Sequence, residues 1–330
     1  MISPTATAQL LWEAAAAARL APSIHNTQPW RFVLTPSALQ VHADHDRQLR
    51  VADPDGRQLM LSIGCAVFNA RAALAARGYD AVVTRLPDPD DPSLVARLEL
   101  PAQQADWVPI AALEPHIVRR HSNRSAFLDT SVAASVRYEL AIAAQQEQAE
   151  LIEVRDQPTR LRVARLSQEA DLRENTDPAY RQELDTWTTG SPLRKDGVPA
   201  MAVPYRAGEV SHISDVLPIR DFDTHRMGWL HAEDRSDSQE CVLLLVTAAD
   251  DPLAWLRAGE ALQRVWLEAT RADYGISLFS QVIDIADLRA QLRSELELTG
   301  YPQMVLRVGR AAATPESSRR DLDEILTITT

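Results

Sequence analysis

The chain has 330 residues, of which 45% are hydrophobic and 24% are charged, and its formal net charge is −12. This length can bury one large core or two smaller ones, whereas the acidic charge disfavours nucleic acids and anionic membrane surfaces as partners. The longest apolar run, residues 241–249, falls far short of the roughly 20 residues that cross a membrane, and the N-terminus lacks the basic and apolar regions of a signal peptide, so we expect a cytoplasmic protein.

The first part of the chain predicts two helices and four strands. An alanine-rich run before Pro22 indicates a helix that the proline ends. A second helix is expected after the Asp-Pro-Asp-Gly turn at 53–56, with its apolar residues on one face and Gly78 at its end. In chain order, the expected elements are a helix at 5–21, strands at 30–34 and 39–43, a helix at 57–77, and strands at 82–86 and 94–100.

A similar alternation follows in the rest of the chain. The expected elements are helices at 107–118 and 132–148, a strand at 151–155, a long helix at 159–187 that Pro178 can interrupt, a strand at 242–248, helices at 253–273 and 285–298, and a last strand at 303–308. Helices around a small sheet in each half indicate an α+β fold. We therefore expect two halves, residues 1–105 and 106–330, although the duplication rests on element order and no residue-level repeat supports it.

Residues 188–237 fit neither half. They contain glycines, prolines and charges without a sustained period, and an unstructured run of this length is unusual inside a compact domain. They also include apolar and aromatic residues, among them Phe222 and Trp229, in greater number than a flexible linker carries. We expect a lid that lies on the protein; an ordered surface excursion without a role is the alternative.

Several common kinds of site lack support in the sequence. Neither GxGxxG nor GxxxxGK[ST] occurs, so a Rossmann dinucleotide site and a P-loop are not expected. Cys65 and Cys241 are isolated, and we interpret both as buried apolar side chains rather than metal ligands. The histidines and aspartates of residues 42–46 are interpreted as a solvated loop rather than a metal site.

Two polar segments remain as candidates for a binding site. Residues 23–28 form a polar loop between two prolines that leads into the strand at Trp30. Because Asn and Gln side chains both donate and accept, this loop can face the polar edge and ribityl hydroxyls of a flavin; an ordinary helix–strand connection is the alternative. Residues 119–124 gather three arginines suited to phosphate, and a solvated charged turn is the alternative there. A second basic pair, residues 319–320, follows the last strand and can fold back over the body.

These segments together resemble a known family. The segment APSIHNTQPWRF at 21–32 resembles the PSxxNxQPW signature of the FMN-dependent nitroreductases, and its HNTQPWRF form is similar to the actinobacterial, dormancy-associated Acg-type branch. Residues 120–127 resemble the family's Arg-x-Ser-x-[Lys/Arg]-x-x-Phe flavin motif. Residues 259–275 resemble its Ala/Leu-rich helix ending in glycine, and residues 303–309 with the basic pair at 319–320 resemble its ending.

The order of the motifs implies a fused arrangement. In ordinary nitroreductases one subunit carries the Arg-x-Ser motif before the PSxxNxQPW motif, and two subunits share two FMN sites. Here the order is reversed and each motif occurs once. The resemblance therefore implies a nitroreductase-like fold of two fused halves, an intramolecular pseudo-dimer with one FMN site. The lid at 188–237 takes the place of a second QPW loop, and the protein is expected to be a monomer or a weak homodimer.

The resemblance also implies which residues bind FMN. Gln28 and Trp30 would brace the loop, Arg124 would lie at the N1/O2 edge, and the basic pair would bind the phosphate. Residues 279–281 would pass the N5 face, where the family's acidic residue followed by glycine is absent. The complete set of expected FMN-binding residues is Pro22, Ser23, His25, Asn26, Gln28, Arg120, His121, Ser122, Arg124, Phe279, Ser280, Gln281, Arg319 and Arg320. We expect no side-chain acid or base in catalysis and no metal.

Three functions fit these expectations. The first is an oxidoreductase that uses NAD(P)H to reduce nitroaromatic or quinone-type acceptors, with the protein supplying orientation and electrostatics around the flavin. The second is a binding protein that sequesters FMN beneath a lid that excludes nicotinamide. The third is an interaction module without flavin, with the arginine cluster as its partner surface.

Overall fold

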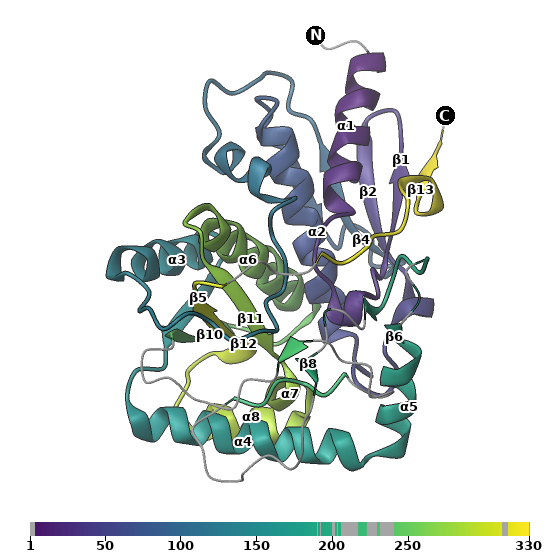
Figure 1. Ribbon diagram of the computed structural model, residues 1–330. Helices are drawn as coiled ribbons and strands as arrows, with labels where there is room; N and C mark the ends of the chain where they lie inside the picture. Colours follow the sequence, from purple (N-terminus) through teal and green to yellow (C-terminus); the bar gives the residue numbers. More distant parts are fainter. Residues whose placement is uncertain are drawn as a thin grey trace.

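The computed structural model of this chain describes residues 4–189, 191, 193–199, 202, 204–205, 217–222, 230–231, 241–311 and 316–329. More than half of the expected lid, residues 188–237, lies outside the described residues. The described elements form two mainly antiparallel sheets with helices packed between and beside them (Figure 1). The expected α+β fold class is confirmed.

The first sheet joins the N-terminal strands to one strand from the other end of the chain. Its order is β13-β1-β2-β4-β3, with β13 parallel to β1 and the other neighbours antiparallel. The elements of this part are α1 (Pro4–Ala18), η1 (Ile24–Asn26), β1 (Trp30–Leu34), β2 (Ala38–Ala43), η2 (His45–Arg47), α2 (Arg57–Ala75), β3 (Val82–Arg85), β4 (Leu94–Glu99), η5 (Leu322–Glu324) and β13 (Leu326–Ile328).

The second sheet has the order β11-β12-β10-β5, and all its neighbours are antiparallel. Its strands and the surrounding helices are η3 (Pro109–His116), α3 (Ala134–Gln146), β5 (Ala149–Glu153), α4 (Gln157–Thr176), α5 (Pro178–Thr186), β10 (Cys241–Thr247), α6 (Pro252–Arg271), β11 (Gly275–Phe279), α7 (Gln281–Asp284), α8 (Ala286–Glu295) and β12 (Tyr301–Gly309). Two short pairs lie outside both sheets: β6 (Thr188–Thr189) with β7 (Val198–Pro199), and β8 (Pro204–Tyr205) with β9 (Leu230–His231).

Most expected elements are present, and the differences have local causes. The helix expected at 107–118 is present as the 3-10 helix η3 rather than as an α-helix, because Pro115 inside it cannot donate a backbone hydrogen bond. The break near Pro178 is confirmed, since Asp177 ends α4 and its carboxylate caps α5 at the Ala179 N–H. Strands β11 and β13 and the short helix α7 were not predicted, because their short segments have no sustained period.

Helices α2 and α6 cross at two glycines, which brings their backbones into direct contact. A Cβ atom on Gly64 would lie 2.0 Å from the Leu256 carbonyl oxygen, and one on Gly259 would lie 2.0 Å from the Leu61 carbonyl oxygen. A side chain cannot approach a carbonyl oxygen this closely, so both positions require glycine. The contact is reciprocal: the glycines are each the eighth residue of their helix, and the leucines are each the fifth.

The two sheets repeat the same arrangement around this crossing. The order β3-β4-β2-β1 in the first corresponds to β11-β12-β10-β5 in the second. The strand pairs β2–β4 and β10–β12 each contain one register shift, between Val41 and His42 and between Leu245 and Val246, at corresponding positions. Helix α1 packs on α2 as α3 packs on α6. Among the described residues, β13 has no counterpart in the second sheet.

Helix α2 is the centre of the core. It is long and apolar enough to cross a membrane by composition, but 94% of its most apolar window is buried inside the fold. Its apolar face packs against α1 and its crossing point packs against α6. The helix is therefore a core helix whose composition follows from burial on nearly all sides.

Gly259→Ala is expected to lower the free energy of unfolding by about 2–4 kcal/mol, because the added methyl group forces the crossing helices apart. At an unconstrained helix position the same change would stabilise the protein by about 1 kcal/mol. Urea denaturation of the variant and the parent measures the difference. An increase in stability would mean that the helices do not meet at this residue.

Candidate functional site

A cavity lies between the two halves beside the helix crossing. It measures about 850 Å³ including its open mouth. Its walls come from the loop at 22–25, from α2, from residues 122–124, from β11 and the start of α7, and from residues 219–222. Leu61, Cys65, Leu262 and Met304 give it an apolar part, while serine and glutamine side chains give it a polar part. Such a mixture is typical of small-molecule sites.

The polar loop after α1 has an unusual backbone. His25, Asn26 and Gln28 have φ values of +45°, +56° and +50°, in the left-handed region that non-glycine residues rarely adopt. The Ser23 hydroxyl accepts from the Gln28 N–H at 2.9 Å, and the Ser62 hydroxyl on α2 accepts from the Ile24 N–H at 3.1 Å. These bonds hold the loop against α2 and place Ser23 and His25 on the cavity wall.

Asn26 and Gln28 hold other parts of the chain in place. The Asn26 amide donates to the carbonyl oxygens of Gly197 and Ser318 at 3.0 and 3.1 Å. The Gln28 amide donates to Lys195 O at 2.9 Å, and its oxygen accepts from the Arg320 N–H at 2.8 Å. Both side chains thus tie the loop to residues 195–197 and 318–320, and neither lines the cavity.

Residues 217–222, called the strap below, cross one side of the cavity. The Phe222 ring packs edge-on against the His25 ring with 5.2 Å between centroids, and the Arg124 guanidinium lies 5.4 Å from the Phe222 centroid. The Gln281 amide donates to Pro218 O at 3.0 Å. The strap therefore contacts three residues that the sequence assigns to the flavin site.

Arg220 holds the strap in place and keeps His25 in its neutral form. Its guanidinium contacts His25 Nε2 at 2.6 Å and also the carboxylates of Glu174 and Asp284 at 3.0 and 2.9 Å. Burial, followed by the positive charges of Arg220 and Arg124, lowers the pKa of His25 well below its usual value. A guanidinium can only donate, so His25 is neutral and accepts through Nε2.

The buried Arg120 and the partly exposed Arg124 and Arg319 lie together near the loop. Burial lowers the pKa of Arg120 and of Arg124 to about 10. The pKa of Arg319 falls to about 9, because of burial and then the charges of Arg120, Arg19 and Arg124. Within the described part of the chain, none of Arg120, Arg124 and Arg319 pairs with a carboxylate. Uncompensated buried cations are costly, so the cluster favours an anion.

The structure brings most of the expected site residues together. Those that line the cavity are Pro22, Ser23, His25, Ser122, Arg124, Phe279, Ser280 and Gln281. Arg120, His121 and Arg319 do not line the cavity. Arg120 and Arg319 donate to the carbonyl oxygens of Leu20 and Ala21 just before the loop, and their charges act on His121. Arg320 differs from the expectation for a phosphate ligand: its guanidinium faces Glu324 rather than the cavity.

Sequence reasoning missed several lining residues and two cations, Arg19 and Arg220. Gln58, Ser62 and Cys65 face the cavity from α2, and their i, i+4, i+7 spacing is a signal that could have found them. Cys65 is buried as expected, and burial raises its pKa to about 12. Arg19 and Arg220 reach the site only through long-range contacts, so no local pattern marks them.

No family model matches the chain, but curated relatives span nearly all of it. A Mycobacterium tuberculosis protein named "Putative NAD(P)H nitroreductase Rv3131" is 34% identical over 322 residues, which cover 93% of this chain and 88% of that protein. The M. tuberculosis protein named "Putative NAD(P)H nitroreductase acg" is 28% identical over 319 residues, covering 92% and 91%. The chain belongs to the Acg-containing nitroreductase family. The resemblance that the loop and the Arg-x-Ser segment carry is thereby confirmed.

Solved structures of nitroreductases superpose on part of the chain. One, from Desulfitobacterium hafniense with bound FMN, is 13% identical, covers 66% of this chain and 98% of its own, and has a TM-score of 0.40. Another with bound FMN, from Bacteroides fragilis, is 11% identical, covers 63% and 94%, and has a TM-score of 0.38. Membership of the family rests on the sequence relatives.

Arg120→Met is expected to raise the free energy of unfolding by about 1–2 kcal/mol without added ligand. It removes a buried charge whose lowered pKa reports the cost of burial, and the lost stacking on Trp266, at 4.6 Å, offsets only part of the gain. Thermal and urea unfolding measure it. Arg119→Met is the control, because Arg119 is exposed and its pair with Asp273 contributes little. A loss of stability in Arg120→Met larger than in the control would contradict the uncompensated charge.

Proposed function

We propose that this chain binds one FMN in the cavity and uses it as an NAD(P)H-dependent oxidoreductase that reduces nitroaromatic or quinone-type acceptors. The observation that carries the proposal is the group of Arg120, Arg124 and Arg319 beside a half-polar cavity in an acidic chain, where desolvation lowers the pKa of all three guanidinium groups. The names of the relatives, which include NAD(P)H nitroreductase, support the activity.

The residues present fit the chemistry of FMN. A phosphate dianion would supply the countercharge that the arginine cluster lacks, and guanidinium groups suit phosphate because they donate two parallel hydrogen bonds. Arg19, with its Nε unpartnered in the described structure, and Arg319 would hold the phosphate in place of the expected Arg320. The apolar residues Leu61, Leu262 and Met304 suit the flat ring, and Ser23, Ser122 and Gln58 suit its polar edge and ribityl chain.

The chain's own residues would bind and orient rather than transfer protons. When bound, FMN supplies hydride and electron transfer between nicotinamide and the acceptor. Arg124 would place a positive charge at the cavity wall, where it favours a more negative flavin. His25 is held neutral and cannot easily act as an acid. We accordingly assign no catalytic side chain.

We also propose that the chain is a fused pseudo-dimer in which only one of two equivalent flavin-binding sites is retained. Around the glycine crossing, Cys65 and Glu260 are each the ninth residue of α2 and α6. The buried Tyr274 and Tyr79 occupy corresponding places before β11 and β3. Ser280 and Arg85 each lie the same number of residues after that tyrosine, so they correspond to each other. The counterparts of two cavity residues are thus Glu260 and Arg85.

Those two counterparts form a bidentate ion pair. Arg85 donates to both oxygens of Glu260 at 2.6 and 2.7 Å. Arg71 bridges Glu260 and Glu147 at 2.6 Å to each, and Arg264 pairs with Glu147 at 2.8 Å. The position in the first sheet that is equivalent to the cavity is therefore filled by buried charges that neutralise one another. This arrangement supports one FMN per chain and a monomer or weak homodimer, since a single chain supplies both walls of the site.

An FMN-sequestering protein is the second candidate, and the strap favours it. Ile219, Arg220 and Phe222 line the cavity, and Arg220 is tied to His25, Glu174 and Asp284. A strap held this firmly can keep nicotinamide and acceptors away from a bound flavin.

Titration of the wild-type protein with FMN is expected to give one site per chain, measured by calorimetry or flavin fluorescence quenching. Arg124→Gln is expected to raise the Kd by about 10- to 100-fold, because a charge-assisted contact contributes about 1.5–3 kcal/mol. Arg119→Gln, on the same segment but exposed, is the control. A stoichiometry of two FMN per chain would refute the proposal of a single retained site, and no binding would refute the proposed function.

Anaerobic mixing of the FMN-loaded protein with NADH or NADPH is expected to bleach the flavin absorption within seconds. Reduction on this timescale requires that nicotinamide reach the flavin past the strap. If the absorption persists while dithionite still bleaches it, the sequestering function holds instead of the enzymatic one.

A further inference from the structure

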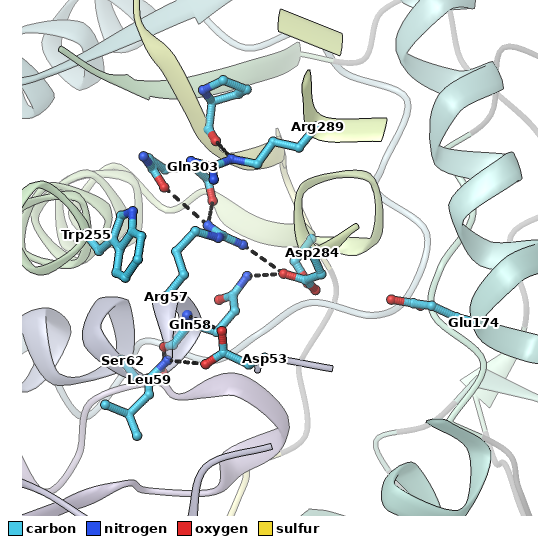
Figure 2. A network of polar contacts seen from close by, with 12 residues as sticks. Asp53, Arg57, Gln58, Leu59, Ser62, Glu174, Trp255, Asp284, Arg289 and Gln303 are labelled. Carbon is cyan, nitrogen blue, oxygen red and sulfur yellow. Dashed lines mark hydrogen bonds and ion pairs between the residues drawn. The ribbon is translucent and has the colours of Figure 1, made fainter. Parts of the chain in front are cut away.

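Asp284 collects four donors at the edge of the cavity. One carboxylate oxygen accepts from Arg57 at 2.8 Å and from the Gln58 amide at 2.6 Å. The other accepts from Arg220 at 2.9 Å and from the Ser280 hydroxyl at 2.7 Å. Its side chain is only 2% exposed. Figure 2 shows Arg57 and Gln58 on α2 both pointing at Asp284, with Asp53 holding the first turn of the same helix.

These contacts fix the direction of the Ser280 hydrogen bond. Guanidinium groups have no lone pair to offer, and an amide nitrogen can only donate. The carboxylate therefore acts as the acceptor in every one of its four contacts. The single hydroxyl hydrogen of Ser280 must point at Asp284, because the 2.7 Å contact joins two oxygens and only the serine has a hydrogen to give.

Ser280 consequently meets the cavity as an acceptor. It lines the cavity wall, and its hydroxyl oxygen keeps two lone pairs after donating its hydrogen. Arg220 occupies one of them at 3.2 Å, the longest of its contacts to this group of residues. The other stays available to a ligand. Ser277 lines the same cavity, but within the described structure its hydroxyl has no partner and so can donate or accept.

We propose that Asp284 is a positioning residue that holds Ser280 as an obligate hydrogen-bond acceptor, so that the ligand of this cavity presents an N–H or O–H donor to Ser280. The inference rests on the proposed function in taking that ligand to be FMN. A flavin has such donors in both redox states, at N3 and on the ribityl chain, and gains one at N5 on reduction. Ser280 thereby selects the orientation of the ligand, its redox state, or both.

The test is a double-mutant cycle in the full-length protein. Ser280→Ala removes the acceptor, and Asp284→Asn frees the serine hydrogen because the new amide nitrogen can donate to the hydroxyl. Each change alone is expected to weaken FMN binding by about 3- to 10-fold, and the double variant is expected to lose no more than either single one. Ser277→Ala combined with Asp284→Asn is the control cycle, in which the effects should add. Ser280→Thr keeps the hydroxyl and should bind FMN with a Kd within about twofold of the wild-type value.

The midpoint potential of bound FMN tells which donor is involved. If the donor exists only in the reduced flavin, Ser280→Ala lowers the potential, by about 30 mV for a tenfold preference in a two-electron couple. If the donor exists in both states, the Kd changes and the potential does not. Either result supports the acceptor role. Additive effects in the Ser280–Asp284 cycle, or an unchanged Kd and potential in Ser280→Ala, would overturn this inference alone. Failure of the wild-type protein to bind FMN would overturn the proposed function and this inference with it.

Discussion

Helices α2 and α6 touch through their backbones at Gly64 and Gly259, and the geometry of the cavity depends on that contact. Because the axes lie so close, side chains on the first turns of α2 line the same cavity as β11, which follows α6. A larger residue at the crossing would separate the two sheets and with them the two walls. A steric constraint within the core therefore sets the distance between the walls of the cavity, and the polar groups are held on a rigid backbone.

The structure uses buried charge in two different ways on the two sides of the crossing. At Arg85 and Glu260 the charges neutralise each other with short bidentate contacts. At Arg120, Arg124 and Arg319 no carboxylate among the described residues neutralises the charges, and burial lowers their pKa values. Only the second arrangement costs stability until an anion arrives. In the pseudo-dimer proposed above, one copy would keep the binding site and the other would use its charges for stability.

Local motifs predicted part of the lining of the cavity. The loop at 22–30 and the segment at 120–124 are contiguous, so their residue types alone indicated a binding role, and the family relationship confirms the resemblance they carry. Asn26 was expected to contact the flavin, but its side chain joins distant backbone segments. Gln28 braces the loop as expected, through bonds to Lys195 and Arg320 that lie far away in the sequence. Arg220 and Asp284 meet only through folding, and neither short-range spacing nor composition could reveal such a contact. The strand β13 was missed for the same reason, since tertiary pairing with β1 decides it. The 3-10 form of η3 is different, because Pro115 is a local signal that the prediction did not use.

Strand β13 pairs in parallel with β1, although nearly the whole chain separates them. The same return path brings Arg319 beside Ala21, whose carbonyl oxygen accepts its Nε–H at 3.1 Å. On a ribosome, the first sheet and the cationic cluster would both stay incomplete while the second half is being made. Under the proposed function, FMN could bind only after both sheets had been synthesised. Bound FMN would therefore indicate that translation had passed β13.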